Sequence, residues 1–382
     1  KTAKLHFGQK AYQAFMSTNE KGVNMANKKW LIYGANGYTG VLVAQEALQR
    51  GHKPVLAGRT AQKLASLAEK LGLDMLVFDL QNANEVAEKI ADFDLVFHAA
   101  GPFIHTSLPM VRACLKTQTH YLDITGEISV FEQNFAFDAE ARTAGIAIIS
   151  GVGFDVVPSD CLLNYVAGKI QNASHLELAF ASPQGTTSAG TTKTMIEHLP
   201  KGVFARRNGE LQQIDPQALV RTIRFADRER TVMPISWGDL ATAYRSTGVP
   251  NISVFAAMPP KVAARTGKIL PIARKLLKIG FLRKLAQAWV VKNVKGPDAK
   301  TRQTARCYFW AQASNQTGDK AEAWLETPEG YHLTAVAGVC SVEKIFELQP
   351  TGALTPAQAF GVDFVLELPD VERFDRLPES AT

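Results

Sequence analysis

The sequence predicts an α/β protein, with a Rossmann-type, doubly wound parallel sheet followed by a second α+β domain on an antiparallel or mixed sheet. Three observations support this prediction. A turn with three evenly spaced glycines follows the first apolar run. Short apolar runs then alternate with amphipathic segments as far as Ser150, and from His175 apolar residues recur at alternate positions. At 382 residues, the chain is long enough to form two hydrophobic cores.

The glycine turn joins the apolar run Trp30-Leu31-Ile32-Tyr33 to a helical segment at 41–50. In a dinucleotide-binding βαβ unit, the first glycine permits a tight turn, the second lets the backbone approach a pyrophosphate, and the third lets the helix pack close to the strand. The pyrophosphate lies on the helix N-terminus, where free N–H groups and the helix dipole favour negative charge. We therefore expect this turn to bind a dinucleotide through Gly34, Asn36, Gly37, Tyr38, Thr39 and Gly40.

Five further apolar runs are typical of strands that are buried on both faces of a parallel sheet. They lie at 54–57, 75–78, 95–98, 121–122 and 146–149, and amphipathic segments such as 60–71 and 84–90 separate them. This alternation implies right-handed crossovers, and ligands of such sheets bind beyond the carboxyl ends of the strands.

The end of the second strand indicates which dinucleotide is bound. An NAD-preferring domain places an acid about 20 residues past the glycine turn, for the ribose 2′-hydroxyl. This sequence has Arg59 there and Lys63 one helical turn later. A guanidinium suits a 2′-phosphate, so we expect NADP(H), although Arg59 can also be a solvated residue at a helix start. Asp79, after the third strand, either accepts from the adenine amino group or caps a helix.

The fourth strand ends in small residues, which let the backbone lie against the cofactor near its nicotinamide end. These residues are Ala99, Ala100, Gly101 and Pro102. His98, which precedes them in an apolar strand, is better explained as a hydrogen-bonded core histidine than as a catalyst.

Three residues are candidate catalytic groups. Asp123 ends the fifth strand on the cofactor side, where burial can make a carboxyl group a general acid, a base or a substrate anchor. Asp155 lies in the glycine-rich turn after the sixth strand, and a catalytic and a structural role fit it equally. Tyr244 is a further candidate proton donor. Glu127 is better explained as the start of a helix.

A competing pattern is Tyr165-Val166-Ala167-Gly168-Lys169, which matches the Tyr-x-x-x-Lys pair of short-chain dehydrogenases. On a helix the two side chains share a face, so the lysine can lower the pKa of the tyrosine. An apolar stripe explains this helix without catalysis, and the helix follows the sixth strand rather than the fifth.

After residue 175 the pattern changes to that of antiparallel strands at 176–181 and 304–314, with hairpins at 205–213 and 223–233. A helix begins near Ser188, and its N-terminus either binds an anion or carries an ordinary cap. Between Lys261 and Lys295 the chain has ten basic residues and no acidic one, whereas the remainder has 32 basic and 36 acidic residues. Apolar residues recur there at helical spacing, and Pro271 and Gly280 should divide the segment into shorter helices. Such helices either lie in a membrane interface or form a lid with a solvated basic face.

Seven short motifs together resemble the saccharopine dehydrogenase-like oxidoreductases, the group that includes the mycobacterial trans-acting enoyl reductases. They are the turn Gly34 to Gly40, Ala99-Ala100-Gly101-Pro102-Phe103, Tyr121-Leu122-Asp123-Ile124-Thr125-Gly126-Glu127, Gly153-Phe154-Asp155-Val156-Val157-Pro158-Ser159-Asp160, Ser188-Ala189-Gly190-Thr191, Trp237-Gly238-Asp239-Leu240 with Tyr244, and Thr355-Pro356-Ala357-Gln358-Ala359-Phe360-Gly361.

The resemblance implies a domain organisation and a substrate class. It implies an NADP-binding domain at 27–150, completed by about 334–365, with an α+β substrate domain inserted at 151–333. Saccharopine reductases carry a Gly-Phe-Asp-Pro-Gly turn, whereas this chain has Gly153-Phe154-Asp155-Val156-Val157. This difference favours the lipid-linked branch over an amino-acid substrate.

The rest of the chain excludes several other classes. The four cysteines are far apart and match no zinc spacing, so we expect no metal and a cytoplasmic protein with reduced thiols. No apolar run reaches the length of a membrane span, and the local basic segment does not indicate nucleic-acid binding. Residues 1–26 are polar, and we expect a disordered leader or tag because Met25 precedes the first strand.

Together these features predict an NADPH-dependent oxidoreductase that reduces a C=C bond of a lipid or acyl substrate, with peripheral membrane contact through 261–295 and a homodimer left open. Two alternatives stay open. One is an amino-acid C–N oxidoreductase of the saccharopine type, and the other is a non-catalytic, membrane-associated NADP(H)-binding protein.

Overall fold

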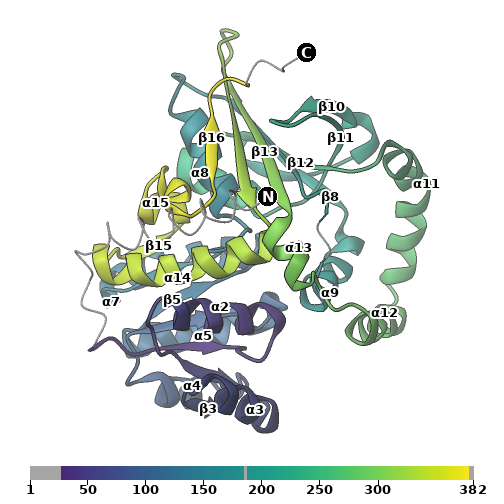
Figure 1. The fold of residues 1–382 in the computed structure, drawn as a ribbon. Coiled ribbons are helices and arrows are strands. Elements are labelled where there is room, and N and C mark those ends of the chain that lie inside the picture. The colour runs from purple at the N-terminus through teal and green to yellow at the C-terminus, as the bar shows by residue number, and fades with distance from the viewer. Residues whose placement is uncertain (1–26, 185–186, 378–382) are drawn as a thin grey trace, which may run out of the picture.

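The computed structural model describes residues 27–184 and 187–377. The expected leader at 1–26 lies outside the described residues. Two β-sheets form the framework of the molecule, and the long helix α14 (Gly330–Leu348) lies between them (Figure 1). Among the described residues, no helix is both long enough and apolar enough to cross a bilayer.

The first sheet is parallel throughout, as predicted. Its seven strands lie in the order β15-β6-β5-β4-β1-β2-β3. Their bounds are β1 (Trp30–Tyr33), β2 (Val55–Gly58), β3 (Met75–Val77), β4 (Leu95–His98), β5 (His120–Asp123), β6 (Ala147–Ile149) and β15 (Gly352–Leu354). The strand order reverses between β1 and β4, whose last residues Tyr33 and His98 pair in register. The turns that follow these two strands therefore emerge side by side, which is where doubly wound folds bind their ligands.

Helices cover both faces of this sheet because each crossover carries an apolar stripe. They are α2 (Tyr38–Gln49), α3 (Ala61–Leu71), α4 (Ala83–Ile90), α5 (Phe103–Thr117), α6 (Ile128–Phe135) and α7 (Asp138–Ala144). The C-terminal helix α14 packs beside α2 on one face. Gly338 lets α14 lie close to the sheet, because a Cβ there would be 2.8 Å from the ring of Phe97 in β4.

The second sheet is mixed, which confirms the predicted fold class. Seven of its strands lie in the order β10-β11-β12-β7-β13-β14-β16, and the hairpin β8–β9 joins at β12. The strands β12 and β7 pair in parallel, and the other pairs are antiparallel. The bounds are β7 (His175–Ala181), β8 (Val203–Arg207), β9 (Glu210–Ile214), β10 (Arg221–Arg224), β11 (Glu229–Pro234), β12 (Asn251–Ala257), β13 (Arg306–Ser314), β14 (Lys320–Pro328) and β16 (Glu372–Phe374).

The helices around this sheet include the basic segment, where one prediction was wrong. Helix α11 (Pro260–Leu277) runs through Pro271 without a break, and α12 (Gly280–Asn293) begins at the expected Gly280. A proline removes one helical hydrogen bond, and the turns on either side hold the helix together here. The remaining elements are α8 (Val157–Ala167), α9 (Ala189–His198), η3 (Leu199–Lys201), η4 (Pro216–Leu219), α10 (Asp239–Thr247), α13 (Ala299–Thr304), α15 (Pro356–Phe360) and η5 (Phe364–Glu367).

Candidate functional site

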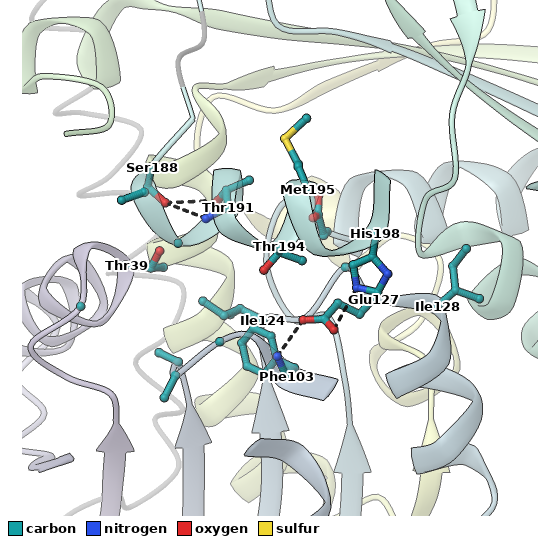
Figure 2. A pocket seen from close by; sticks show the side chains of 18 of the residues that line it. Thr39, Phe103, Ile124, Glu127, Ile128, Ser188, Thr191, Thr194, Met195 and His198 are labelled. Carbon is teal, nitrogen blue, oxygen red and sulfur yellow. Dashed lines mark hydrogen bonds and ion pairs between the residues drawn. The ribbon is translucent and has the colours of Figure 1, made fainter. Parts of the chain in front are cut away.

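A cavity of about 780 Å³ lies at the carboxyl ends of the parallel strands. The glycine turn, the ends of β4 and β5 and the turn that carries Asp155 form its floor. Helix α9 and the end of α12 form its other wall. In Figure 2, α9 passes above the loops that follow the strands, and His198 points from it towards Glu127. The cavity therefore lies between the dinucleotide-binding edge of one sheet and helices attached to the other.

The glycine turn is built for close approach by a ligand. Gly34 has a positive φ of +83°, and a Cβ there would lie 2.8 Å from the Cβ of Ala100. A Cβ on Gly40 would overlap the carbonyl oxygen of Gly34, so this third glycine lets α2 sit against the turn. The first turn of α2 carries Tyr38, Thr39 and Gly40 rather than an acidic residue. No acidic side chain therefore competes with an anion at the N-terminus of α2, and the N–H groups of this first turn suit a diphosphate.

Most of the residues predicted to hold the cofactor come together at this cavity. Those that line it are Gly34, Asn36, Gly37, Tyr38, Thr39, Ala99, Ala100 and Gly101. Gly40 lies behind them, and Pro102 occupies the N-cap position of α5. The hydroxyl of Tyr38 donates to the carbonyl of Pro297 (2.5 Å) and accepts from Arg302 (2.8 Å), which links the turn to the segment before α13.

The residues predicted to recognise the adenosine end lie on the far side of Asn36. Lys63 and Lys70 of α3 line a second, open pocket together with Asn36. Arg59 is exposed at the end of β2, one turn before Lys63. Asp79 Oδ1 accepts the N–H of Gln81 (2.9 Å) and closes a turn before α4, whereas the side chain that caps α4 is that of Asn82.

Asp155 is one of three carboxyl residues that line the cavity, the others being Glu127 and Glu132. Burial raises its pKa from the ordinary 3.8 to about 7. Its carboxylate lies against the backbone of Gly126, where an added Cβ would overlap Oδ2. Among the described residues, none donates a hydrogen bond to this carboxyl group. An acid with a pKa near neutrality that opens into a cavity is suited to proton transfer.

Asp123 and Tyr244 lie outside the residues that line the cavity. Asp123 is fully buried and accepts four hydrogen bonds, from the hydroxyls of Tyr121 and Ser150 (2.9 Å each) and from the N–H groups of Thr125 and Gly151 (3.0 Å each). Burial raises its pKa to about 6, although these donors oppose the shift. This carboxylate therefore ties the loops after β5 and β6 together.

Tyr244 lies on α10, with its ring 4.2 Å from the guanidinium of Arg206, and its side chain is well exposed. Its hydroxyl lies near Gly209, in the turn between β8 and β9, so it faces a hairpin rather than the cavity.

A Glu–His pair was not singled out as a functional site from the sequence. Glu127 accepts the N–H groups of Phe103 (2.7 Å) and Ile104 (3.1 Å) at the start of α5, and its Oε2 lies 3.2 Å from Nε2 of His198 (Figure 2). Both side chains line the cavity, and Glu127 is 2% exposed. The two residues are 71 positions apart, so no local spacing could have revealed the pair.

The N-terminus of α9 is capped by a side chain. Ser188 Oγ accepts the N–H of Thr191 (3.3 Å), and the backbone N–H of Ser188 donates to the hydroxyl of Tyr331 (2.6 Å). The ordinary cap thus accounts for these residues, although Ser188, Gly190 and Thr191 also line the cavity.

The Tyr165 and Lys169 pair has a structural partner. Both side chains bind Asp375, the tyrosine hydroxyl at 2.8 Å and the lysine Nζ at 2.6 Å, and neither lines the cavity. Together they hold the C-terminal strand segment onto α8. His98 is buried, its Nε2 lies 3.1 Å from the hydroxyl of Thr106, and burial lowers its pKa to about 4.

Within residues 27–184 and 187–377, no three His, Cys, Asp or Glu side chains cluster as metal ligands would. The four cysteines are free and buried, and burial raises the pKa of each thiol.

Comparisons with known proteins agree with this geometry. The family model described as saccharopine dehydrogenase NADP binding domain matches residues 30–149. A trans-acting enoyl reductase of Mycobacterium ulcerans is 30% identical over 402 residues, which cover 89% of this chain and 95% of that protein. A trans-acting enoyl reductase of Mycobacterium tuberculosis is also 30% identical, over 404 residues that cover 89% of this chain and 95% of that protein.

Among solved structures, the saccharopine dehydrogenase (L-Glu forming) of Saccharomyces cerevisiae matches with a TM-score of 0.56 at 12% identity. The match covers 91% of this chain and 100% of that one, which shows a shared fold. With the NADP-binding domain at 30–149, the chain is an NAD(P)-dependent oxidoreductase. It belongs to the saccharopine dehydrogenase-like oxidoreductases, in the branch that contains the trans-acting enoyl reductases.

Proposed function

We propose that this oxidoreductase uses NADPH to reduce a C=C bond conjugated to a carbonyl group in an acyl or lipid-type substrate. The observation that carries this proposal is Asp155, a cavity-facing acid whose pKa is raised to about 7 by burial, beside the predicted nicotinamide end of the cofactor site. Apolar side chains shape the space around it, from Phe103, Ile124, Ile128, Phe204, Leu211 and Trp237. Such a wall suits a hydrocarbon chain better than an amino acid.

The residues present fit the cofactor. The glycine turn and the N-terminus of α2 would hold the diphosphate, and Arg59 with Lys63 would recognise the 2′-phosphate. Ala99, Ala100 and Gly101 leave room for the nicotinamide ring. When bound, the reduced cofactor supplies the hydride that the reaction requires.

Asp155 then has a defined task. One alkene carbon receives the hydride, and Asp155 gives its proton to the other carbon, so that the C=C bond becomes a saturated C–C bond. The ionised Asp155 regains a proton from water before the next turnover. The Glu127–His198 pair holds α9 over the site and keeps the start of α5 in place.

A second reaction is favoured by one observation. Lys201 and Lys295 line the cavity and can bind carboxylates, which suits reduction or oxidation at an amino-acid C–N bond. The turn Asp155-Val156-Val157, in which valines stand where saccharopine reductases carry Pro-Gly, counts against this reading.

The experiment is to follow NADPH oxidation by purified protein with 2-enoyl thioesters of increasing chain length, and with imine and saccharopine-type substrates in parallel. We expect turnover with the enoyl series, a rate that rises with chain length, and loss of turnover in Asp155→Asn. Turnover with the imine substrates alone would support the second reaction and end the first.

A further inference from the structure

Helices α11 and α12 carry the most exposed apolar side chains of the described chain. Eight large apolar residues between positions 262 and 291 are 50–73% exposed, and Phe281 and Trp289 are the most exposed of them, at 73% and 63%. In Figure 1 these helices stand at one side of the molecule, with α11 beside the β10–β11 edge of the second sheet and α12 near α9. A concentration of apolar surface of this kind marks an interaction site.

These side chains form two rows. Ile272 and Leu276 are spaced by four residues along α11, and Phe281, Leu285 and Trp289 are spaced by four along α12. Each set therefore lies on one helix face. Other faces are packed, since α11 contacts β11, η3 and η4, and α12 contacts α9. A lid that packs on its own protein explains those contacts and leaves the two rows uncovered. We call the rows, together with the basic residues around them, the docking surface.

Strong positive charge surrounds the rows. The segment from 261 to 295 has ten basic residues and no acidic one. Seven of them are exposed, namely Lys261, Arg265, Lys275, Lys278, Lys284, Lys292 and Lys295. Within the described residues, an ion pair of this segment joins Arg283 to Glu197 at 3.6 Å. The charge is therefore directed outward rather than neutralised within the molecule.

The last turn of α12 reaches the cavity. Val291 is 60% exposed, yet it also lines the cavity, together with Val294 and Lys295 at the end of α12. Helix α12 thus carries the Phe281–Trp289 row on one face and cavity-lining residues at its C-terminal end.

We propose that α11 and α12 dock onto an anionic lipid membrane, with Phe281, Leu285 and Trp289 inserted at the acyl boundary and the lysines on the headgroups. Aromatic and aliphatic side chains flanked by long basic ones are what an interfacial helix requires. A second copy of the chain is disfavoured as the occupant, because ten basic residues would face ten. The proposal goes beyond the reaction above and does not depend on it.

The test is flotation of the full chain with vesicles, in the absence of cofactor and substrate. We expect binding to vesicles that contain phosphatidylglycerol, weak binding to pure phosphatidylcholine, and release by high salt. Trp289 also provides a spectroscopic signal, because Trp30, Trp310 and Trp324 are at most 8% exposed and Trp237 is half-buried in the cavity, away from the docking surface. Its emission should shift to the blue on binding.

Two variants make the test specific. The double variant Phe281→Ser/Trp289→Ser should weaken partitioning by at least about tenfold. Leu348→Ser is the matched control, because it removes an apolar side chain that is 48% exposed on α14, and it should bind as the native chain does. Unaltered thermal unfolding of each variant checks the fold.

Three results would overturn the proposal: equal binding to both kinds of vesicle, no binding to either, or unchanged binding of the double variant. Beads coated with poly-glutamate serve as a model of an acidic protein partner. If the chain bound these beads but no vesicle, the docking surface would belong to a protein partner instead. Because the measurement involves no turnover, it can succeed or fail independently of the enoyl reduction.

Discussion

Nε2 of His198 lies 3.2 Å from Oε2 of Glu127, and this pair joins the last residue of α9 to the loop after β5. The buried carboxylate also accepts two backbone N–H groups at the start of α5, where the helix dipole favours negative charge. One side chain thus fixes both the floor of the cavity and the helix above it.

Removing Glu127 should lower the free energy of unfolding by more than removing His198. Glu127→Ala leaves the N–H groups of Phe103 and Ile104 without their acceptor, so we expect a loss of about 2–4 kcal/mol in the free energy of unfolding. His198→Ala should cost at most about 1 kcal/mol, because the imidazole side chain is 28% exposed. It should instead raise KM and speed hydrogen exchange in α9. Chemical denaturation and exchange mass spectrometry check both, and equal destabilisation by the two changes would contradict this division.

Asp155→Asn should remove the proton donor and leave cofactor binding intact. We expect kcat to fall by about 10²–10⁴-fold. In the native protein the rate should fall as pH rises through about 7, because the donor must be protonated. The pH–rate profile and an NADPH titration are the measurements. A native profile that stayed flat from acid to alkaline pH would exclude Asp155 as the donor.

Asp155→Asn should lower the rate of turnover but raise the stability of the folded protein at alkaline pH. Burial raises the pKa of Asp155 to about 7 in the folded protein, whereas the unfolded chain titrates near the ordinary 3.8. Below pH 3.8 Asp155 is protonated in both the folded and the unfolded state, so its ionisation does not change the free energy of unfolding. As pH rises from 3.8 to about 7, the carboxyl group ionises in the unfolded state but not in the folded state, and the folded state therefore loses stability. Asp155→Asn should therefore be more stable than the native protein by about 1–4 kcal/mol at pH 8 and equal to it near pH 4. Thermal unfolding at the two pH values decides the matter.

Gly126→Ala tests the position of the Asp155 carboxylate. The new methyl group would overlap Oδ2 of Asp155, so the acid must move. We expect turnover to fall by about tenfold or more with little change in NADPH affinity. Gly168→Ala is the control, because a Cβ there would meet nothing nearer than the carbonyl oxygen of Asn164 at 3.4 Å. Full activity in the Gly126 variant would show that the carboxylate need not occupy this place.

Arg59→Asp tests the choice of dinucleotide. A carboxylate in place of the guanidinium repels a 2′-phosphate and accepts from a 2′-hydroxyl, so NADPH affinity should fall by about 10–100-fold while NADH affinity rises. Lys53→Asp, an exposed basic residue before β2, gives the same charge change elsewhere. Fluorescence titration with both cofactors measures the effect, and an unchanged NADPH affinity would remove Arg59 from the site.

The parallel sheet could be predicted because each strand is a short apolar run and each crossover has its own stripe. Strand β15 was missed, since Gly352-Ala353-Leu354 has no period and belongs to the sheet only through its pairing with β6. The sequence predicted a helix near Ser188, but it could not show that this helix, α9, forms a wall of the cavity. This wall depends on Glu127 and His198, two residues that are close in space and far apart in the chain.

The candidate acids show where sequence reasoning ends. Asp123 and Asp155 both follow strands of the same sheet, and their sequence contexts do not separate them. Four hydrogen-bond donors surround Asp123, whereas Asp155 opens into the cavity. The difference lies in how the loops fold over each carboxylate, which only tertiary packing determines.

Strand β15 and helix α14 also determine when the parallel sheet can finish folding during synthesis. The strand pairs with β6, some two hundred positions earlier, and the helix packs on α2 near the other terminus. Synthesis must therefore pass residue 354 before the nucleotide-binding half can gain its last strand and its covering helix. Contacts of such long sequence separation form slowly, so the first six strands stay incompletely covered until residues 330–354 have been made and have folded onto them.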